Sequence, residues 1–236
     1  APFVKDVFIN GQWKTVALGG MRHGGKLFYA LDLGESPEDE PTVLWEFTDQ
    51  DDNDLGFTYS GGVIGRIAYP SGSTTVESKW VAFLPNGYNS NSYKSVMYVV
   101  DLETGQVLHK WDTGIGDVSN PNGMGSPVAA DFVVYDETDT TNTFYGSDQG
   151  IDFVYAGDLH GNVYKFNVKD IFTHSNTMEI LYAGSSDRPI TSAPRVFTPS
   201  DGSENVIVTF GTGKYIELPD RGVSGLPKQY MFGLKD

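Results

Sequence analysis

The sequence predicts an all-β protein, folded as a β-propeller with four-stranded antiparallel blades. Two observations support this prediction: short apolar strands run from end to end, and similar segments recur about every 68 residues. The strands are β-branched and aromatic runs such as Trp80–Leu84, Val96–Val100 and Val206–Phe210. The 28 Gly and 12 Pro residues indicate many turns between them.

The repeat is marked by four similar strands that begin at Tyr29, Tyr98, Tyr164 and Phe232. In the later units, a strand marked by Gly or Pro comes first, after Ser60, Ser126 and Ser192. A second strand precedes each aromatic landmark, and a fourth strand follows the first three landmarks. Four antiparallel strands in tandem repeats are typical of propeller blades, which bury their two apolar faces by stacking on neighbours.

The repeat divides a single propeller domain, residues 1–236, into about three and a half blades. The expected units are a partial blade at 11–48, a blade at 60–113, a blade at 124–184 and a partial blade at 190–236. The first is expected to lack its first strand and the last its fourth. Because propellers usually close with about four to eight blades, we expect part of a larger ring. Such a part exposes unpaired strand edges and an apolar blade face.

Composition excludes several classes of function. The chain of 236 residues has 31 acidic and 16 basic side chains, a net charge of −15, which disfavours binding to nucleic acid or anionic lipid. The absence of cysteine excludes disulfides, thiolate nucleophiles and Cys-ligated zinc. No apolar run reaches the roughly 18 residues of a transmembrane helix. The N-terminus lacks a secretory signal and is expected to be the interior of a longer sequence.

Catalytic motifs are missing as well. The four histidines are scattered without metal-ligand spacing, and no Gly-x-Ser-x-Gly elbow occurs. The segment Gly211–Lys214 lacks the spacing and the helix of a phosphate-binding loop. Paired carboxylates of a glycosidase stay open, because their distances cannot be deduced from the sequence. Trp45, Trp80 and Trp111 are interpreted as packing between blades rather than as a sugar platform. We therefore expect a protein that is not an enzyme.

A series of specific motifs runs in order from about Val16 to Gly233. Its members are Tyr29–Leu33 with Leu44–Phe47, Asp54–Thr58, Asn86–Ser90, Tyr98–Gly105, Tyr155–Phe166 and Phe210–Tyr215. This series resembles the PilC/PilY-type pilus-tip proteins. The resemblance implies the C-terminal propeller of a type IV pilus biogenesis and tip adhesion factor that binds calcium. Such factors influence pilus extension, retraction and surface attachment.

The resemblance also implies a place and partners. The expected location is the bacterial cell surface, at the pilus tip or associated with the outer membrane. The expected partners are minor pilins, the rest of the same chain, and host or abiotic surfaces.

One alternative is a quinoprotein-like dehydrogenase, because repeats of Tyr-x-x-Asp-Leu-x-Thr-Gly followed by Trp resemble its blades. That enzyme needs a complete ring, a quinone and calcium, and many members have vicinal cysteines that this chain lacks.

Family members bind calcium in a short acidic loop between the first two strands of one blade. By the resemblance, Asp152 corresponds to the closing carboxylate, Asp148 to the third ligand, and Gly150 to a backbone carbonyl ligand. The first two ligand positions fall on Phe144 and Gly146, which offer no side-chain oxygen. The segment is longer than the family loop, and its additional candidate ligands are Asp131, Asp136, Glu137, Asp139 and Asn142. The alternative is a solvated acidic loop that has lost the metal.

A second acidic run, Asp49–Asp54, begins like an EF-hand loop. Its sixth position is Asp54 rather than Gly and its twelfth is Ser60 rather than Glu, which excludes that motif. We interpret this run as an exposed loop.

Overall fold

The computed structural model describes residues 2–36, 38–70, 76–131, 150–169, 171–172, 177–197, 206–222 and 224–236. Within these ranges the chain forms β-strands and two short 3-10 helices, η1 (Arg22–Gly24) and η2 (Leu218–Arg221), and no α-helix. The all-β prediction is therefore confirmed. No helix in the described ranges is long and apolar enough to cross a membrane.

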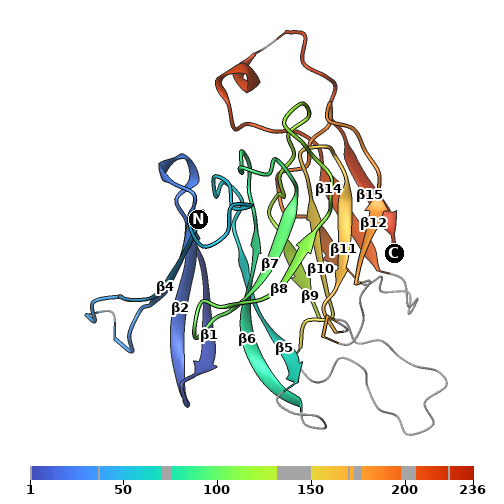
Figure 1. Cartoon of the computed structure of the whole chain (residues 1–236). Coiled ribbons are helices and arrows are strands. Elements are labelled where there is room, and N and C mark those ends of the chain that lie inside the picture. The colour runs from blue at the N-terminus through green and yellow to red at the C-terminus, as the bar shows by residue number, and fades with distance from the viewer. Residues whose placement is uncertain are drawn as a thin grey trace, which may run out of the picture.

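The strands form four antiparallel sheets that stand side by side (Figure 1). The first sheet contains β1 (Phe3–Ile9), β2 (Gln12–Gly20), β3 (Leu27–Asp32) and β4 (Thr42–Thr48). The second contains β5 (Val63–Pro70), β6 (Val76–Pro85), β7 (Val96–Asp101) and β8 (Val107–Asp112). The third contains β9 (Val128–Ala130), β10 (Phe153–Gly157), β11 (Val163–Asn167) and β12 (Met178–Tyr182). The fourth contains β13 (Arg195–Phe197), β14 (Ile207–Gly211) and β15 (Met231–Lys235).

The first sheet has one strand more than predicted. We expected a partial blade at 11–48 without a first strand, and this expectation was wrong. β1 is that first strand, and it pairs with β2 along its whole length. The two strands are joined by Asn10 and Gly11, whose φ angles are 52° and 75°. An Asn-Gly pair with two positive φ angles is the preferred two-residue hairpin turn. This pair between two apolar runs was the signal that could have located β1.

The sheets pack face to face through three successive apolar layers. One cluster joins the first and second sheets, a second joins the second and third, and two smaller ones join the third and fourth. The first strands of the sheets adjoin in the same succession, β1 next to β5, β5 next to β9 and β9 next to β13. The second and third sheets thus bury both faces, and the first and fourth sheets bury one face each, as stacking of the repeats predicts.

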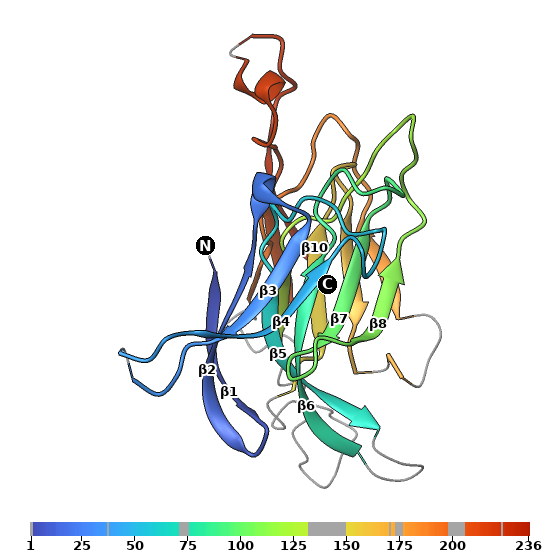
Figure 2. The same cartoon turned by 60° about the vertical axis from the view of Figure 1, so that its left-hand side comes forward.

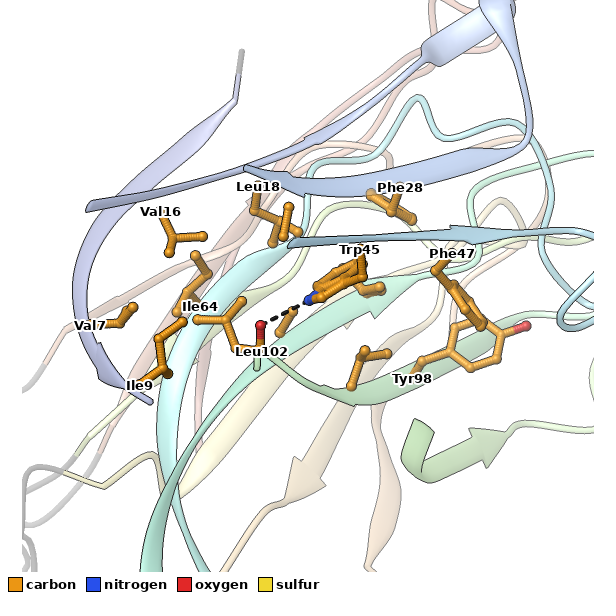
Figure 3. Close-up of a cluster of buried hydrophobic side chains, with 14 of the residues drawn as sticks. Val7, Ile9, Val16, Leu18, Phe28, Trp45, Phe47, Ile64, Tyr98 and Leu102 are labelled. Atoms are coloured by element: carbon orange, nitrogen blue, oxygen red, sulfur yellow. Dashed lines mark hydrogen bonds between the residues drawn. The ribbon is translucent and has the colours of Figure 1, made fainter. Parts of the chain in front are cut away.

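Tryptophans on fourth strands link the first sheet to the second and the second sheet to the third. Trp45 of β4 lies in the layer between the first two sheets and donates its indole N–H to the Leu102 carbonyl at 2.9 Å (Figure 3). Trp111 of β8 similarly donates to the Oγ1 atom of Thr177, which directly precedes β12 of the third sheet, at 2.8 Å. The interpretation of Trp45 and Trp111 as packing between blades is confirmed.

The glycine of the repeat's Thr-Gly pair is explained by this packing. Gly105 has a φ of +76°, and a Cβ atom there would lie 2.8 Å from the Cβ and Cγ atoms of Trp45. Only glycine meets both demands, because other residues disfavour positive φ and would collide with the indole. The turn of one blade is therefore shaped by the tryptophan of the blade before it.

Candidate functional site

The proposed calcium region begins and ends at one end of the third sheet. Asp131 directly follows β9, and Asp152 directly precedes β10. Ala130 pairs with Phe153, and the backbone N–H of Asp152 donates to the Ala130 carbonyl at 3.0 Å. The two aspartates therefore flank the same end of one antiparallel strand pair, with Gly150 two residues away in the chain. Asp136, Asp139 and Asp148 lie outside the described residues.

The backbone at this end is held by the neighbouring second sheet and by the third sheet itself. The N–H of Ile151 donates to the Arg66 carbonyl of β5 at 2.7 Å, and the N–H of Val168 donates to the Asp152 carbonyl at 2.8 Å. The Ile151 side chain packs into the layer between the second and third sheets. It lies so close to Gly65 that a Cβ atom on Gly65 would be 2.4 Å from Ile151 Cγ1. The backbone position of Asp152 is therefore fixed by these contacts.

The described residues at this end offer the donor chemistry that calcium prefers. Asp131 and Asp152 supply carboxylate oxygens, and Gly150 has a backbone carbonyl, the ligand types that Ca²⁺ prefers. Within the described ranges, no group of three or more His, Cys, Asp or Glu side chains is placed to hold a metal. Because three of the six predicted ligands lie outside those ranges, calcium binding stays a prediction.

The acidic run at residues 49–54 is a loop in which Gln50, Asp51 and Asn53 are exposed, and two of its aspartates make a contact that we did not predict. Asp52 and Asp54 both contact the Lys110 ammonium on β8, at 2.6 and 2.5 Å. Burial alone would raise the pKa of Asp54, but hydrogen bonds from Lys110 and Ser92 and the charges of Lys110 and Lys94 together outweigh it, so the pKa is lowered. The run thus attaches the end of the first sheet to the outer strand of the second, and Lys110 is the cation it holds.

A buried carboxylate that sequence reasoning missed lies in the strongest motif, Tyr155–Phe166. Asp158 is fully buried and accepts hydrogen bonds from four donors. The donors are Asn162 N at 2.8 Å, Asn162 Nδ2 at 3.0 Å, Tyr164 Oη at 2.8 Å and Asn122 Nδ2 at 2.8 Å. Burial and the Asp158 charge raise the pKa of Tyr164, so its hydroxyl stays protonated and donates.

This arrangement is structural rather than catalytic. Asn122 belongs to the connection between β8 and β9, whereas Asn162 and Tyr164 belong to the β10–β11 hairpin. Asp158 therefore joins the entry of the third sheet to its central hairpin, and its carboxylate accepts from Asn122, Asn162 and Tyr164. A buried charge with several donors is stabilised in place and leaves no group free to react.

Comparisons with known proteins agree with the repeat and the stacked sheets. A family model described as "PilY1 beta-propeller domain" matches residues 1–236. The type IV pilus biogenesis factor PilY1 of Pseudomonas aeruginosa is 30% identical over 260 residues, which cover 100% of this chain and 20% of that protein. A PilY1 homolog of Xylella fastidiosa is 32% identical over 247 residues, covering 96% of this chain and 15% of that protein.

A solved structure agrees as well. The crystal structure of the Pseudomonas aeruginosa PilY1 C-terminal domain matches with a TM-score of 0.78 and 30% identity, over 100% of this chain and 48% of that one. The predicted propeller fold is thereby confirmed. The chain spans a fifth or less of the curated relatives above and about half of the solved domain.

Proposed function

Because this chain belongs to the PilY1 beta-propeller domain family, we propose that it is a non-catalytic module of a type IV pilus biogenesis factor. The family match over all 236 residues is the observation that carries the proposal. The resemblance of the motif series to the PilC/PilY-type proteins is confirmed at the level of the family. The module would support pilus assembly, control of extension and retraction, and attachment to surfaces.

The proposed location is the bacterial cell surface, at the pilus tip or the outer membrane. The proposed partners are minor pilins, host or abiotic surfaces, and the rest of the same protein. The last partner is supported by the outer face of the first sheet, where Val4, Phe8, Trp13 and Val43 are exposed. Phe8 and Trp13 contact each other edge to face there, with ring centroids 5.7 Å apart, and exposed apolar side chains gathered on one face are typical of an interface.

Removal of residues 1–236 from the full protein in its native bacterium tests the function. We expect few or no surface pili and loss of surface attachment, with normal amounts of the major pilin inside the cell. Expression of the intact protein in the same strain should restore both. Normal piliation and attachment in the deletion strain would contradict the proposal. A quinone that co-purifies with the intact protein, or dye-linked alcohol oxidation, would contradict the non-catalytic part.

We further propose that the segment from Asp131 to Asp152 binds calcium. Asp148, Gly150 and Asp152 would be ligands by the resemblance, and Asp131, Asp136 and Asp139 would replace the missing positions. The position of Asp131 and Asp152 at the same end of one strand pair supports this assignment, because it brings two carboxylate-bearing residues together. Calcium bound there would be coupled to the packing of the second and third sheets, because Ile151, next to Asp152, lies in the layer between them.

Calorimetric titration of the full protein with Ca²⁺ alone tests the site. We expect binding heat, and at a hundredfold excess over Kd a stabilisation of about 2.7 kcal/mol, seen as a higher Tm. Asp152→Asn should weaken both effects, whereas the matched control Asp187→Asn, an exposed position on another turn, should not. No heat and no melting shift with the unmodified protein would exclude the site.

A further inference from the structure

The connection between β14 and β15 forms a long arm, Gly213–Gln229, which is described except for residue 223. It rises beyond the ends of the strands in both views (Figures 1 and 2). The arm is braced internally around η2. The Asp220 carboxylate accepts the backbone N–H groups of Ile216 and Glu217, each at 2.8 Å, and Lys214 pairs with Glu217 at 3.1 Å. It is therefore a preformed unit.

Both ends of the arm are attached near the junction of the third and fourth sheets. The N–H of Gly213 donates to the Pro189 carbonyl at 2.6 Å, and Thr191 Oγ1 donates to the Gly213 carbonyl at 3.0 Å. At the other end, Gln229 Nε2 donates to the Asp187 carbonyl at 3.1 Å. The arm thus leaves and rejoins the protein at one place.

The middle of the arm reaches the first sheet. His23, in η1 between β2 and β3, has its Nε2 atom 3.0 Å from the Ile216 carbonyl and its Nδ1 atom 3.3 Å from the Tyr88 hydroxyl. A neutral ring satisfies both contacts if Nε2–H donates to Ile216 and Nδ1 accepts from Tyr88.

Aromatic side chains fix the orientation of this ring. Phe57, Tyr59 and Tyr88 meet the imidazole edge to face, with centroid distances of 6.0, 4.5 and 6.0 Å. These rings come from the segment that joins the first two sheets and from the β6–β7 connection. The donor of His23 is therefore directed at the arm by two elements besides its own.

We propose that the arm is a strap that links the fourth sheet to the first, with His23 as its latch. The apolar layers join successive sheets only in the order of the chain. In such a stack, stability is the sum of units and neighbouring interfaces. The latch adds a link between sheets that are not successive and sets their separation at this end. It is an exposed contact, so it opens at low free energy without unfolding the sheets.

Hydrogen exchange of the full protein tests the latch. In His23→Ala, we expect backbone amides of residues 214–222 to exchange about tenfold faster, as loss of one hydrogen bond predicts, while strand amides keep their protection. His23→Gln, which retains a side-chain N–H, should restore part of the protection.

His160→Ala is the matched control, because His160 Nε2 also lies near a backbone carbonyl, that of Pro121 at 3.1 Å, but on another turn. It should leave exchange in the arm unchanged. Unchanged exchange in His23→Ala overturns the proposal. Equal acceleration in His160→Ala overturns it too, since that would report general loosening. His23→Gln that exchanges as fast as His23→Ala assigns the protection to ring packing and likewise overturns the latch.

Discussion

Gly123→Ala is expected to destabilise the protein by about 3 kcal/mol or more, the upper range for overpacking. A Cβ atom at Gly123 would lie 1.9 Å from the carbonyl oxygen of Gly87 and 3.0 Å from the Tyr88 Cα atom. These neighbours are backbone atoms, which cannot change rotamer to make room. The backbone of Gly123 is also committed, because its N–H donates to Asn122 Oδ1 and its carbonyl accepts from Leu159.

Thermal and denaturant unfolding of the two matched variants measure this effect. Gly61→Ala is the control, because a Cβ atom there would meet no atom within 4 Å. Its free energy of unfolding should stay within about 0.5 kcal/mol of the unmodified protein. Equal stability of Gly123→Ala and Gly61→Ala would show that the loops of the second and third sheets do not approach each other as described.

Asp158→Asn is expected to cost about 2 to 4 kcal/mol of stability, since it leaves buried donors unsatisfied. The substitution keeps the size of the side chain but places an amide N–H₂ among groups that all donate. At least one of Asn122, Asn162 and Tyr164 then loses its acceptor in a site without solvent access.

Asp187→Asn makes the same chemical change at an exposed turn and should be nearly silent, as surface substitutions usually are. Combining Asp158→Asn with Asn122→Ala sharpens the test. The double variant should be destabilised by less than the sum of the single variants, because the two residues share one hydrogen bond. Strict additivity would separate the two residues energetically and contradict the described network.

The stacking of four-stranded units was predictable because each blade repeats the same sequence of apolar strands, turns and a fourth-strand aromatic. Trp45 and Trp111 could be assigned to the layers between blades for this reason. The strand Phe3–Ile9 was missed although the Asn10–Gly11 turn announced it, because the repeat landmarks begin only at Tyr29. The repeat period locates only the strands that recur relative to a landmark. It could not locate a strand that precedes the first landmark.

Individual contacts were less predictable, because their partners are distant in the chain. Asp52 and Asp54 contact Lys110 because the fold places β8 beside the end of β4. His23 meets Ile216 across nearly the whole sequence. The acidic candidates Asp131 and Asp152 could be proposed from the resemblance, but their meeting depends on the register of β9 with β10. Such pairs follow from topology, which composition and spacing do not encode.

The seat of the Trp45 indole on Gly105 has a consequence for chimeric proteins. If the whole second sheet were replaced by that of a relative, the new turn at position 105 would have to pack against Trp45 of the original protein. Any residue other than glycine at that position would collide with the indole. A recombination point between β3 and β4 keeps the two halves of the contact on one inherited piece. The unit to exchange between relatives therefore does not coincide with one sheet. It begins at the fourth strand of one sheet and ends with the turn after the third strand of the next.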